Sequence, residues 1–504
     1  MMSGREYVES LRRVHPRVYF LGEEVEEVVD HPAFKPHVAS AAMTYELAQD
    51  PQHEDLMTAT SHLTAERVNR FTHIHQSTDD LIEKVRMMRL LGQRTGSCFQ
   101  RCVGFDGLNT LYAITYDIDD EFGTDYHQRF IEYLTRVQRE DLMVAGAMTD
   151  VKGDRGKRPH EQEDPDLYLH VVEKRDDGIV VRGAKNHITG TVNSHEILAM
   201  PTRAMSERDE DYAVSFAVPV DAEGITLVFG RQTNDTRRLQ GEIDSGNAKY
   251  GVVGGECLII FDDVFVPWDR VFMCGEYAFT GPLVKTFSSH HRSNYGGCKV
   301  GVVDVLIGAT RLIAEANGVE RAPHVRDKIS EMVHLAETCW SCSLACAHEG
   351  QKTRSGACTV NHLLANVVKL NVSRLAHQWT RLAQDIAGGA LITLPSEKDY
   401  GHPIIGRYID KYYRGRADIP TENRIRIFRL IENMAVGGGL PEYVHGAGSP
   451  ATLKIMIERT MDIEGKKALA ETVAGIKGDE HFQRIWGVEE EEYFREFREK
   501  RGVK

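Results

Sequence analysis

The chain lacks any apolar run that approaches the roughly 20 residues a membrane-spanning helix needs. Its first residues, MMSGREYVESLRRVHPR, contain no apolar segment of the kind found in a secretory signal. A long basic stripe is also missing: 61 Lys and Arg stand against 75 Asp and Glu, and the formal net charge is −14. These absences argue against a membrane protein, a secreted protein and a general nucleic-acid binder.

A disulfide framework is equally absent. The 504 residues contain nine cysteines, an odd number, in a chain without a signal. Such cysteines favour metal binding or free thiols, so we expect a reducing, cytoplasmic location. The sequence shows no internal repeat and no GxGxxG motif after a predicted strand, so a Rossmann nucleotide site is not indicated.

The order of local patterns predicts an α+β multidomain protein in three parts. Residues 1–140 are mainly helical in pattern, with apolar residues at helical spacing between 79 and 91. Residues 141–280 contain short β-rich runs, which predict a barrel or sandwich of roughly six to eight strands. Residues 281–504 return to a helical pattern, with long helices expected at about 361–386 and about 451–474.

Two cysteines and a histidine–cysteine pair are the candidate metal ligands. Cys98 and Cys102 are four residues apart in GSCFQRC, so a helix would place them on one face. His291 and Cys298 are seven residues apart in HHRSNYGGC and would also share a helical face. Thiolates and imidazole bind soft metals and iron–sulfur clusters. The alternative is that these cysteines are buried apolar thiols, the commonest fate of a free cysteine.

A second set of cysteines competes for the same interpretation. Cys339, Cys342 and Cys346 form CxxCxxxC, which by spacing alone is more typical of a cluster site. The same spacing is that of the buried stripe of an amphipathic helix, and Leu335 and Leu344 lie among these cysteines. We therefore predict that this set belongs to a helix core.

Glycines and basic residues suggest where a bulky cofactor could lie. Gly296 and Gly297 precede the last candidate ligand, and we expect them to allow close approach of a cofactor. The segment at 148–159, MTDVKGDRGKRP, is either a solvated loop or a polar cradle for a flavin or a CoA phosphate. The Gly pair in QDIAGGA, residues 384–390, is typical of a helix C-cap.

The order of elements and several motifs resemble the acyl-CoA dehydrogenase-like flavoproteins. Within them, the chain resembles the family of 4-hydroxyphenylacetate 3-monooxygenase and 4-hydroxybutyryl-CoA dehydratase over nearly its whole length. The motifs are YVESLR, DVKGDRGKRPHEQEDPDLYLHVVEK, NHITGTVNS, FDDVFVPWDRVF, DIAGGA and HGAGSP. The monooxygenase branch lacks the cluster ligands, whereas the dehydratase pattern matches the chain at Cys98, Cys102, His291, Tyr295, Cys298 and Lys299.

This resemblance implies dehydration of 4-hydroxybutyryl-CoA to crotonyl-CoA, together with isomerisation of vinylacetyl-CoA. It also implies FAD, a [4Fe-4S] cluster that acts as a Lewis acid in a flavin-radical mechanism, and a homotetramer with flavin sites shared between subunits. Two alternatives stay open. One is a flavin-dependent aromatic monooxygenase, and the other is a non-catalytic electron carrier that holds both cofactors.

The resemblance also assigns roles to residues. The cluster ligands would be Cys98, Cys102, His291 and Cys298. His291 would also be the base at C2, and the other catalytic residues would be Tyr295, Lys299, Glu442, Glu256, Thr189 and Gln100. One chain would contact the flavin through Thr149, Asp150, Lys152, Gly153, Asp154, Arg155, His187, Ile188 and Thr189. The neighbouring chain would add Gln384, Ile386, Ala387, Gly388, Gly389 and Ala390.

Overall fold

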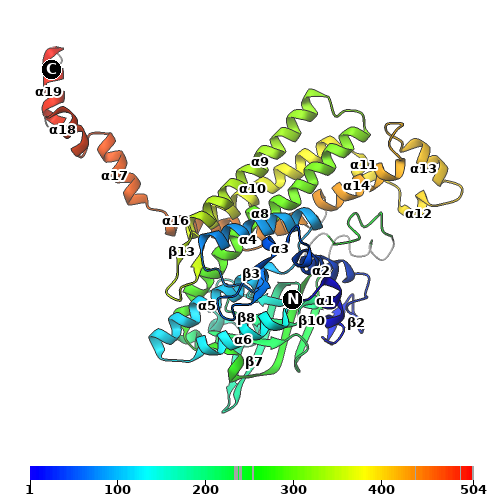
Figure 1. The fold of residues 1–504 in the computed structure, drawn as a ribbon, viewed down its shortest axis with the longest axis horizontal. Helices are drawn as coiled ribbons and strands as arrows, with labels where there is room; N and C mark the ends of the chain where they lie inside the picture. Colours follow the sequence, from blue (N-terminus) through cyan, green and yellow to red (C-terminus); the bar gives the residue numbers. More distant parts are fainter. Residues whose placement is uncertain (232–236, 238–240, 252–254, 437–438, 488–489, 502–504) are drawn as a thin grey trace. The chain divides into compact units, whose positions relative to one another are not determined.

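A computed structural model describes residues 1–231, 237, 241–251, 255–436, 439–487 and 490–501. Backbone contacts divide the chain into two units, residues 1–454 and 455–504. The first unit contains the sheets and the long helices (Figure 1). The second contains α17 (Ile463–Val473), α18 (Glu480–Trp486) and α19 (Glu490–Lys500). The predicted division at 140 and 280 follows the order of elements within the first unit and stays an interpretation.

The N-terminal part is mainly helical, as predicted, but it also contributes strands. Its helices are α1 (Gly4–Leu11), α2 (Lys35–Gln49), α3 (Glu54–Met57), α4 (Thr78–Thr95), α5 (Cys102–Phe122) and α6 (Tyr126–Glu140). Its strands are β1 (Val18–Phe20), β2 (Glu23–Val25), β3 (Thr58–Thr60) and β4 (Arg67–Asn69). Helix α4 covers the predicted apolar stretch and is bounded by a capping box at Ser77 and by Gly96 in the left-handed conformation.

Two sheets form the central part. One has the order β2-β1-β10-β11-β7-β6 and the other β12-β9-β8-β5. Their central strands are β5 (Val144–Ala147), β6 (His170–Lys174), β7 (Gly178–Thr189), β8 (Glu196–Ala199), β9 (Val214–Pro219), β10 (Ile225–Phe229), β11 (Glu256–Pro267) and β12 (Val271–Cys274). Phe216 and Phe261 meet edge to face between the sheets, with ring centroids 5.9 Å apart. The described residues therefore form a sandwich without a closed barrel, and β1 and β2 extend it beyond the predicted range.

A bundle of long helices follows, made of α8 (Thr280–Ala316), α9 (Pro323–His348), α10 (His362–Ala387) and α14 (Thr421–Ala435). Helix α10 confirms the helix expected at about 361–386. The single helix expected at about 451–474 is wrong, because α16 (Pro450–Thr460) ends before α17 begins. Asp462 accepts a hydrogen bond from the amide of Gly465 and so caps a new helix there. Shorter helices are α11 (Ala390–Thr393), α12 (Glu397–Tyr400), α13 (Gly406–Tyr412) and α15 (Gly439–His445).

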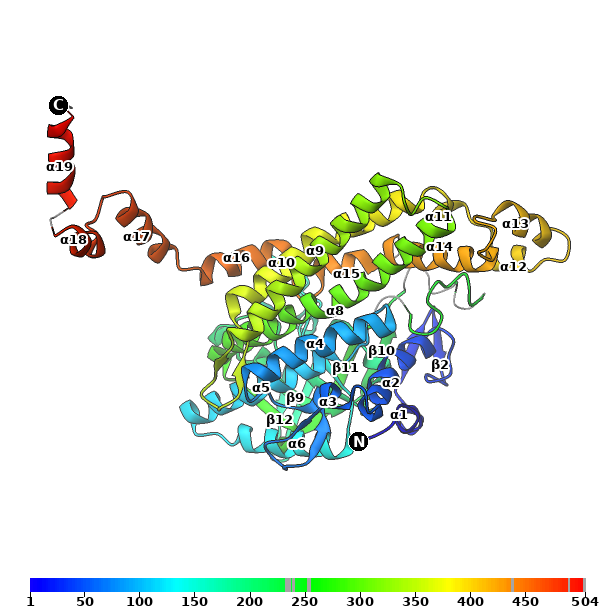
Figure 2. The same ribbon diagram turned by 45° about the horizontal axis from the view of Figure 1, so that its top comes forward.

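Helix α4 runs alongside α8 (Figures 1 and 2), and glycines set how closely the two pack. A Cβ atom on Gly297 would lie 2.6 Å from the carbonyl oxygen of Val85, and one on Gly301 would lie 2.2 Å from that of Arg89. A Cβ atom on Gly296 would lie 2.5 Å from the Cβ of Ser343 in α9. The prediction that Gly296 and Gly297 make room for a cofactor is therefore wrong, since neighbouring helices fill that space.

The competing cysteines lie in the core of α9. Cys339 and Cys346 are fully buried, and Cys342 is partly buried. Cys339 packs in the bundle core with α8 and α10, and Cys346 packs against Leu81 and Val85 of α4. Their burial confirms that this set belongs to a helix core.

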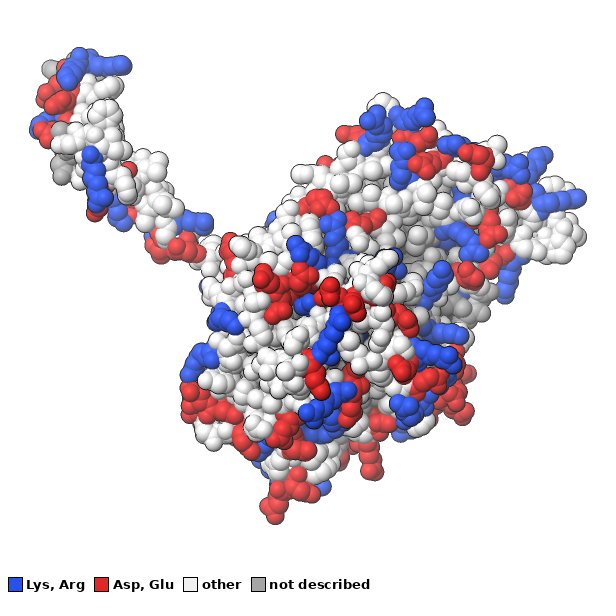
Figure 3. Space-filling model, in the orientation of Figure 1, with Lys and Arg blue, Asp and Glu red and all other residues white. Residues whose placement is uncertain are grey.

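On the face drawn in Figure 3, acidic and basic side chains are interspersed. The described helices include none that is both long enough and apolar enough to span a bilayer.

Candidate active site

Three of the predicted cluster ligands come together where α4, α5 and α8 meet. Cys102 and Cys298 share a buried apolar cluster with Phe99 and Phe105. Cys102 is the first residue of α5, and Cys298 lies in the middle of α8. Cys98 lies in the connection between α4 and α5, so the prediction that it shares a helical face with Cys102 is wrong. The left-handed backbone at Gly96 ends α4 before this cysteine.

Cys102 and Cys298 are buried and Cys98 is partly buried, and the three thiols interact electrostatically. Burial raises the pKa of Cys98 to about 12 and that of Cys298 to about 11. Burial also raises the pKa of Cys102, and the charges of Cys98 and Cys298 raise it further. Thiols in this state bind a metal only by exchanging their protons for it. Three neighbouring sulfur donors fit an iron–sulfur cluster, which takes such ligands.

His291 lies on the same face of α8 as Cys298 and is held in a defined orientation. Its ring stacks on Phe287 with centroids 5.7 Å apart, and it meets Tyr295 edge to face at 5.9 Å. Its Nδ1 lies 2.8 Å from Oδ2 of Asp106. Since an ionised carboxylate only accepts hydrogen bonds, Nδ1 donates and the ring's lone pair is on Nε2. The remaining nitrogen is therefore suited to ligate iron or to take a proton.

Asp106 is itself fixed by two further side chains. Its Oδ1 accepts a hydrogen bond from Nζ of Lys84 at 2.6 Å, and its Oδ2 accepts one from Nδ2 of Asn294 at 2.7 Å. Burial would raise the pKa of Asp106, but Lys84 and His291 more than offset this and hold its pKa below the usual value. Sequence reasoning missed this network, although a lysine within the apolar stripe of a predicted helix was a signal for it.

Tyr295, Lys299 and Glu442 form a second polar group beside the thiols. Nζ of Lys299 lies 2.5 Å from Oε2 of Glu442, and the hydroxyl of Tyr295 donates to Oε1 of Glu442 at 3.3 Å. Burial raises the pKa of Tyr295, and the charges of Glu442 and of all three cysteines raise it further. The structure therefore brings together residues from α8 and α15 that the sequence analysis named separately.

Lys369 of α10 completes this group and was also missed. Its Nζ donates to Oγ of Ser373 at 2.8 Å and to the carbonyl oxygens of Tyr443 at 2.8 Å and Val444 at 3.2 Å. The same ammonium lies 4.5 Å from the centroid of the Tyr295 ring. Burial lowers its pKa to about 7. Lys369 thereby holds the end of α15, the helix that presents the predicted catalytic glutamate.

Glu256 and Thr189 are direct partners across two strands. Glu256 is the first residue of β11, and it lies opposite Thr189, the last residue of β7. Burial raises the pKa of Glu256 to about 8, and the charge of Glu442 adds to this effect. Nε2 of Gln100 lies 2.6 Å from Nδ1 of His37, whereas its buried Oε1 lacks a hydrogen-bond partner among the described residues.

The predicted flavin loop lies along the end of β7. The amide of Asn186 donates to the carbonyl oxygen of Thr149 at 2.7 Å. The carboxylate of Asp150 is buried and pairs with Nζ of Lys185 at 2.7 Å, so it faces the protein interior. Burial and the charge of Arg155 lower the pKa of the Lys152 ammonium. The charges of Lys152 and Arg155 act on His187 near the end of β7, and two such basic side chains fit the diphosphate of a flavin nucleotide.

The second predicted flavin segment stands at the end of α10. Gly388 adopts φ +76°, a conformation that favours glycine, and a Cβ atom on Gly388 or Gly389 would meet nothing within 4 Å. Nε2 of Gln384 donates to the carbonyl oxygen of Ala435 at the end of α14. The start of this segment is therefore held by the Gln384 hydrogen bond, whereas the face formed by its two glycines is open.

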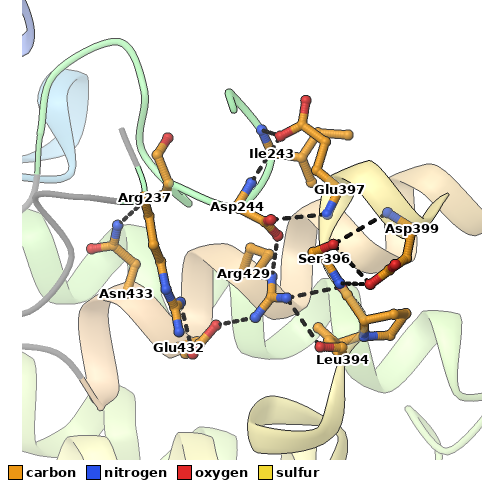
Figure 4. Close-up of polar contacts among 12 residues, drawn as sticks. Arg237, Ile243, Asp244, Leu394, Ser396, Glu397, Asp399, Arg429, Glu432 and Asn433 are labelled. Atoms are coloured by element: carbon orange, nitrogen blue, oxygen red, sulfur yellow. Dashed lines mark hydrogen bonds and ion pairs between the residues drawn. The ribbon is translucent and has the colours of Figure 1, made fainter. Parts of the chain in front are cut away.

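Ion pairs and hydrogen bonds hold the described part of the connection from β10 to β11 against α12 and α14 (Figure 4). Arg429 pairs with Asp244 at 3.0 Å and with Glu432 at 2.7 Å. Oε2 of Glu397 accepts hydrogen bonds from the amides of Ile243 at 2.7 Å and Asp244 at 3.2 Å. This network holds residues 243 and 244 against α12 and α14.

The described residues contain no group of three or more His, Cys, Asp or Glu side chains that converges on a single metal ion. A cluster makes a different demand, because each of its ligands binds a different iron atom. The adjoining thiols and the oriented imidazole supply sulfur and nitrogen donors of the kind that such a cluster takes.

Comparison with protein families matches two models that together span most of the chain. The 4-hydroxyphenylacetate 3-hydroxylase N-terminal model matches residues 3–273, and the C-terminal model of the same family matches residues 280–475. The 4-hydroxybutyryl-CoA dehydratase/vinylacetyl-CoA-Delta-isomerase of Clostridium aminobutyricum is 52% identical over 491 residues, covering 95% of this chain and 100% of its own. The 4-hydroxyphenylacetate 3-monooxygenase oxygenase component of Thermus thermophilus is 27% identical over 448 residues, covering 86% and 89%.

Solved structures agree with these relatives. An oxygen-tolerant archaeal 4-hydroxybutyryl-CoA dehydratase from N. maritimus superposes with a TM-score of 0.92 at 50% identity, covering 96% of this chain and 98% of that one. The oxygenase component of a 4-hydroxyphenylacetate 3-monooxygenase, complexed with FAD, superposes with a TM-score of 0.82 at 24% identity, covering 94% and 98%. The second likeness establishes a shared fold.

Proposed function

The chain belongs to the 4-hydroxyphenylacetate 3-hydroxylase family, and we propose that within it the chain dehydrates 4-hydroxybutyryl-CoA to crotonyl-CoA. The proposal is supported by the identity of 52% to a dehydratase, against 27% to a monooxygenase. The observation that carries it is the meeting of three thiols with Tyr295, the Lys299–Glu442 pair and an oriented His291. A monooxygenase needs no such set of sulfur ligands.

Two cofactors fit the residues described. Cys98, Cys102, Cys298 and His291 would hold a [4Fe-4S] cluster, and the loop at 148–155 with the end of β7 would hold FAD. When bound, the cluster supplies a Lewis-acidic iron for the C4 hydroxyl, and the flavin supplies reversible one-electron chemistry. Thr189 would lie beside the flavin ring, and Glu256 would lie beside Thr189.

His291 is the proposed base at C2. The thioester acidifies the C2 proton. Because Nδ1 donates to Asp106, Nε2 of His291 would be a labile ligand whose lone pair accepts this proton once it no longer binds iron. Overall, C2 and C3 each lose a hydrogen, and C4 loses its hydroxyl and gains a hydrogen, so that water leaves without net oxidation. The same base with a proton donor near C4 would also move a proton from C2 to C4 in vinylacetyl-CoA.

Tyr295, Lys299 and Glu442 are the proposed proton-transfer group at the hydroxyl end. The Tyr295 hydroxyl donates to Glu442, which also pairs with the Lys299 ammonium. Burial and the neighbouring charges raise the pKa of Tyr295 and so hold the proton on its hydroxyl. It can therefore donate a proton to the departing hydroxyl and accept one from carbon later in the cycle.

We also propose a homotetramer in which each flavin contacts two subunits. The segment from Gln384 to Ala390 would reach the flavin of the neighbouring chain, since its glycines leave its outer face open.

The test is turnover of 4-hydroxybutyryl-CoA by the purified protein without an external electron acceptor, together with its optical spectrum. We expect crotonyl-CoA, and absorption of both a flavin and a broad iron–sulfur band. Hydroxylation of 4-hydroxyphenylacetate with reduced flavin and oxygen, and a spectrum without the broad band, would instead indicate a monooxygenase. Both absorptions without any turnover of the CoA ester would indicate an electron carrier.

A further inference from the structure

The side chains that orient His291 come from three helices. Asp106 contacts His291 directly, and Lys84 and Asn294 contact Asp106. Lys84 lies on α4, Asp106 on α5, and Asn294 on α8, one turn after the histidine. Lys84, Asp106 and Asn294 are each at most 1% exposed, so water does not compete for their hydrogen bonds. Asp106 also lies one turn after Cys102 on α5, so one face of that helix carries both a predicted ligand and the acceptor for another.

The three hydrogen-bond donors around the Asp106 carboxylate allow only one placement of the histidine proton. Lys84 donates to Oδ1, whereas His291 and Asn294 both meet Oδ2. All three partners are satisfied only if Nδ1 of the histidine carries a proton. The two carboxylate oxygens are equivalent acceptors, and Lys84 always occupies one of them. Turning the carboxylate over therefore still presents an acceptor to His291.

We infer that Asp106, held by Lys84, is a positioning residue that sets the tautomer of His291 and so directs its Nε2 lone pair to the reaction site. The inference rests on the proposed function, because it concerns His291 as ligand and base. Carboxylates that orient a ligating or catalytic histidine have measurable effects elsewhere, and their loss costs about 10–100-fold in activity or metal affinity.

The decisive variant is Asp106→Asn, which preserves the shape of the side chain and replaces one acceptor oxygen with an NH2 group. The amide oxygen will face Lys84, because turning the NH2 group towards an ammonium would oppose two donors in a buried place. The NH2 group then faces His291, whose Nδ1 must become the acceptor and whose Nε2 must carry the proton. That tautomer neither ligates through Nε2 nor takes a proton there.

The experiment compares wild type, Asp106→Asn and Asp304→Asn. Asp304 pairs with Arg89 between α4 and α8 at 2.9 Å, so its variant controls for loss of an acidic partner between helices of this region. Three readouts are taken: iron content, nitrogen coupling to the one-electron-reduced cluster by pulsed electron paramagnetic resonance, and crotonyl-CoA formation. We expect Asp106→Asn to keep most of its iron, to lose the nitrogen coupling and to lose about 100-fold in rate. Asp304→Asn should keep all three.

A second variant guards against misfolding. Asp106→Asn combined with Asn294→Asp exchanges the two groups, so one carboxylate remains in the buried network and the amide at 106 can donate to it. This variant should fold, yet it still presents an NH2 group to His291 and should lose the nitrogen coupling. Coupling and rate near wild type in either variant would overturn the inference. A wild-type cluster without nitrogen coupling would refute the ligand assignment on which it rests, a result distinct from any difference between the variants.

Discussion

At the scale of single residues, the site is marked by charged side chains that pair in the protein interior. Lys84 with Asp106 and Lys299 with Glu442 place two ion pairs beside apolar packing. Removing one partner of such a pair leaves an unpaired buried charge, which costs about 3–5 kcal/mol. A pair in this position is poor evidence of added stability, and we attribute it to the need for oriented polar groups around the thiols.

Each predicted thiolate ligand should be required for bound iron. Replacing Cys98, Cys102 or Cys298 with Ala removes one of three sulfur donors and should release most of the iron, measured per subunit by colorimetric assay. Cys342→Ala is the matched control, since that cysteine lies in the competing set on α9. Normal iron in Cys298→Ala, or loss of iron in Cys342→Ala, would show that the cluster lies elsewhere.

Glu256 should make the protein less stable as pH rises. Its pKa is raised from 4.5 to about 8, so the folded state binds this proton more tightly than the unfolded state does. The stabilising effect is full below the unfolded pKa and is lost as pH rises through the folded one. We expect wild type to lose about 2 kcal/mol relative to Glu256→Gln between about pH 5 and pH 8, measured by denaturant unfolding. A constant difference between the two proteins across that range would contradict the assignment.

At the scale of elements, close helix contacts decide where the ligands stand. Gly92 of α4 is packed so tightly that a Cβ atom would lie 2.4 Å from the carbonyl oxygen of Cys298. The position of α8, and with it His291 and Lys299, therefore depends on small residues at this contact.

Substitution at Gly301 should separate α4 from α8. A Cβ atom there would lie 2.2 Å from the backbone oxygen of Arg89, so Gly301→Ala should destabilise the protein by about 3 kcal/mol. Gly308→Ala is the control on the same helix, because nothing lies within 4 Å of its added Cβ, and it should stabilise the protein by up to about 1 kcal/mol. Equal unfolding midpoints for the two variants would refute the packing account.

Lys369 should hold α15 in place. Lys369→Met removes the donor to the carbonyl oxygens of Tyr443 and Val444, so hydrogen exchange at 439–448 should accelerate and turnover should fall about tenfold. Lys328→Met is the control, since that lysine forms a more exposed pair with Asp385 at 2.5 Å and should change stability by less than about 1 kcal/mol. Unchanged exchange in Lys369→Met would show that α15 is held by other contacts.

At the scale of the whole molecule, the proposed flavin site would draw on a second chain. One chain would supply the loop at 148–155 beside β7, whereas the segment with the Gly388–Gly389 pair presents an open face at the end of α10. A surface of this kind is suited to a neighbouring subunit.

Gly389→Trp should weaken assembly and flavin binding together. Gly389 has φ −63°, so a side chain adds bulk without backbone strain, which is not the case at Gly388. We expect smaller species by native mass spectrometry and a lower ratio of flavin to protein, with Gly389→Ala close to wild type. A flavin-replete oligomer of normal size for Gly389→Trp would contradict the shared site.

The sequence by itself determined the order of helices, strands and helices, because apolar periodicity and capping residues are local properties. It also identified the CxxCxxxC set as part of a helix core. Only the tertiary structure decided that Cys98 stands outside a helix and that Gly297 serves packing against α4. It alone brought Lys84 to Asp106, 22 positions along the chain, and Lys369 to Val444, 75 positions along it. Local patterns report which face of a helix is apolar, whereas the meeting of remote polar groups depends on how those faces pack.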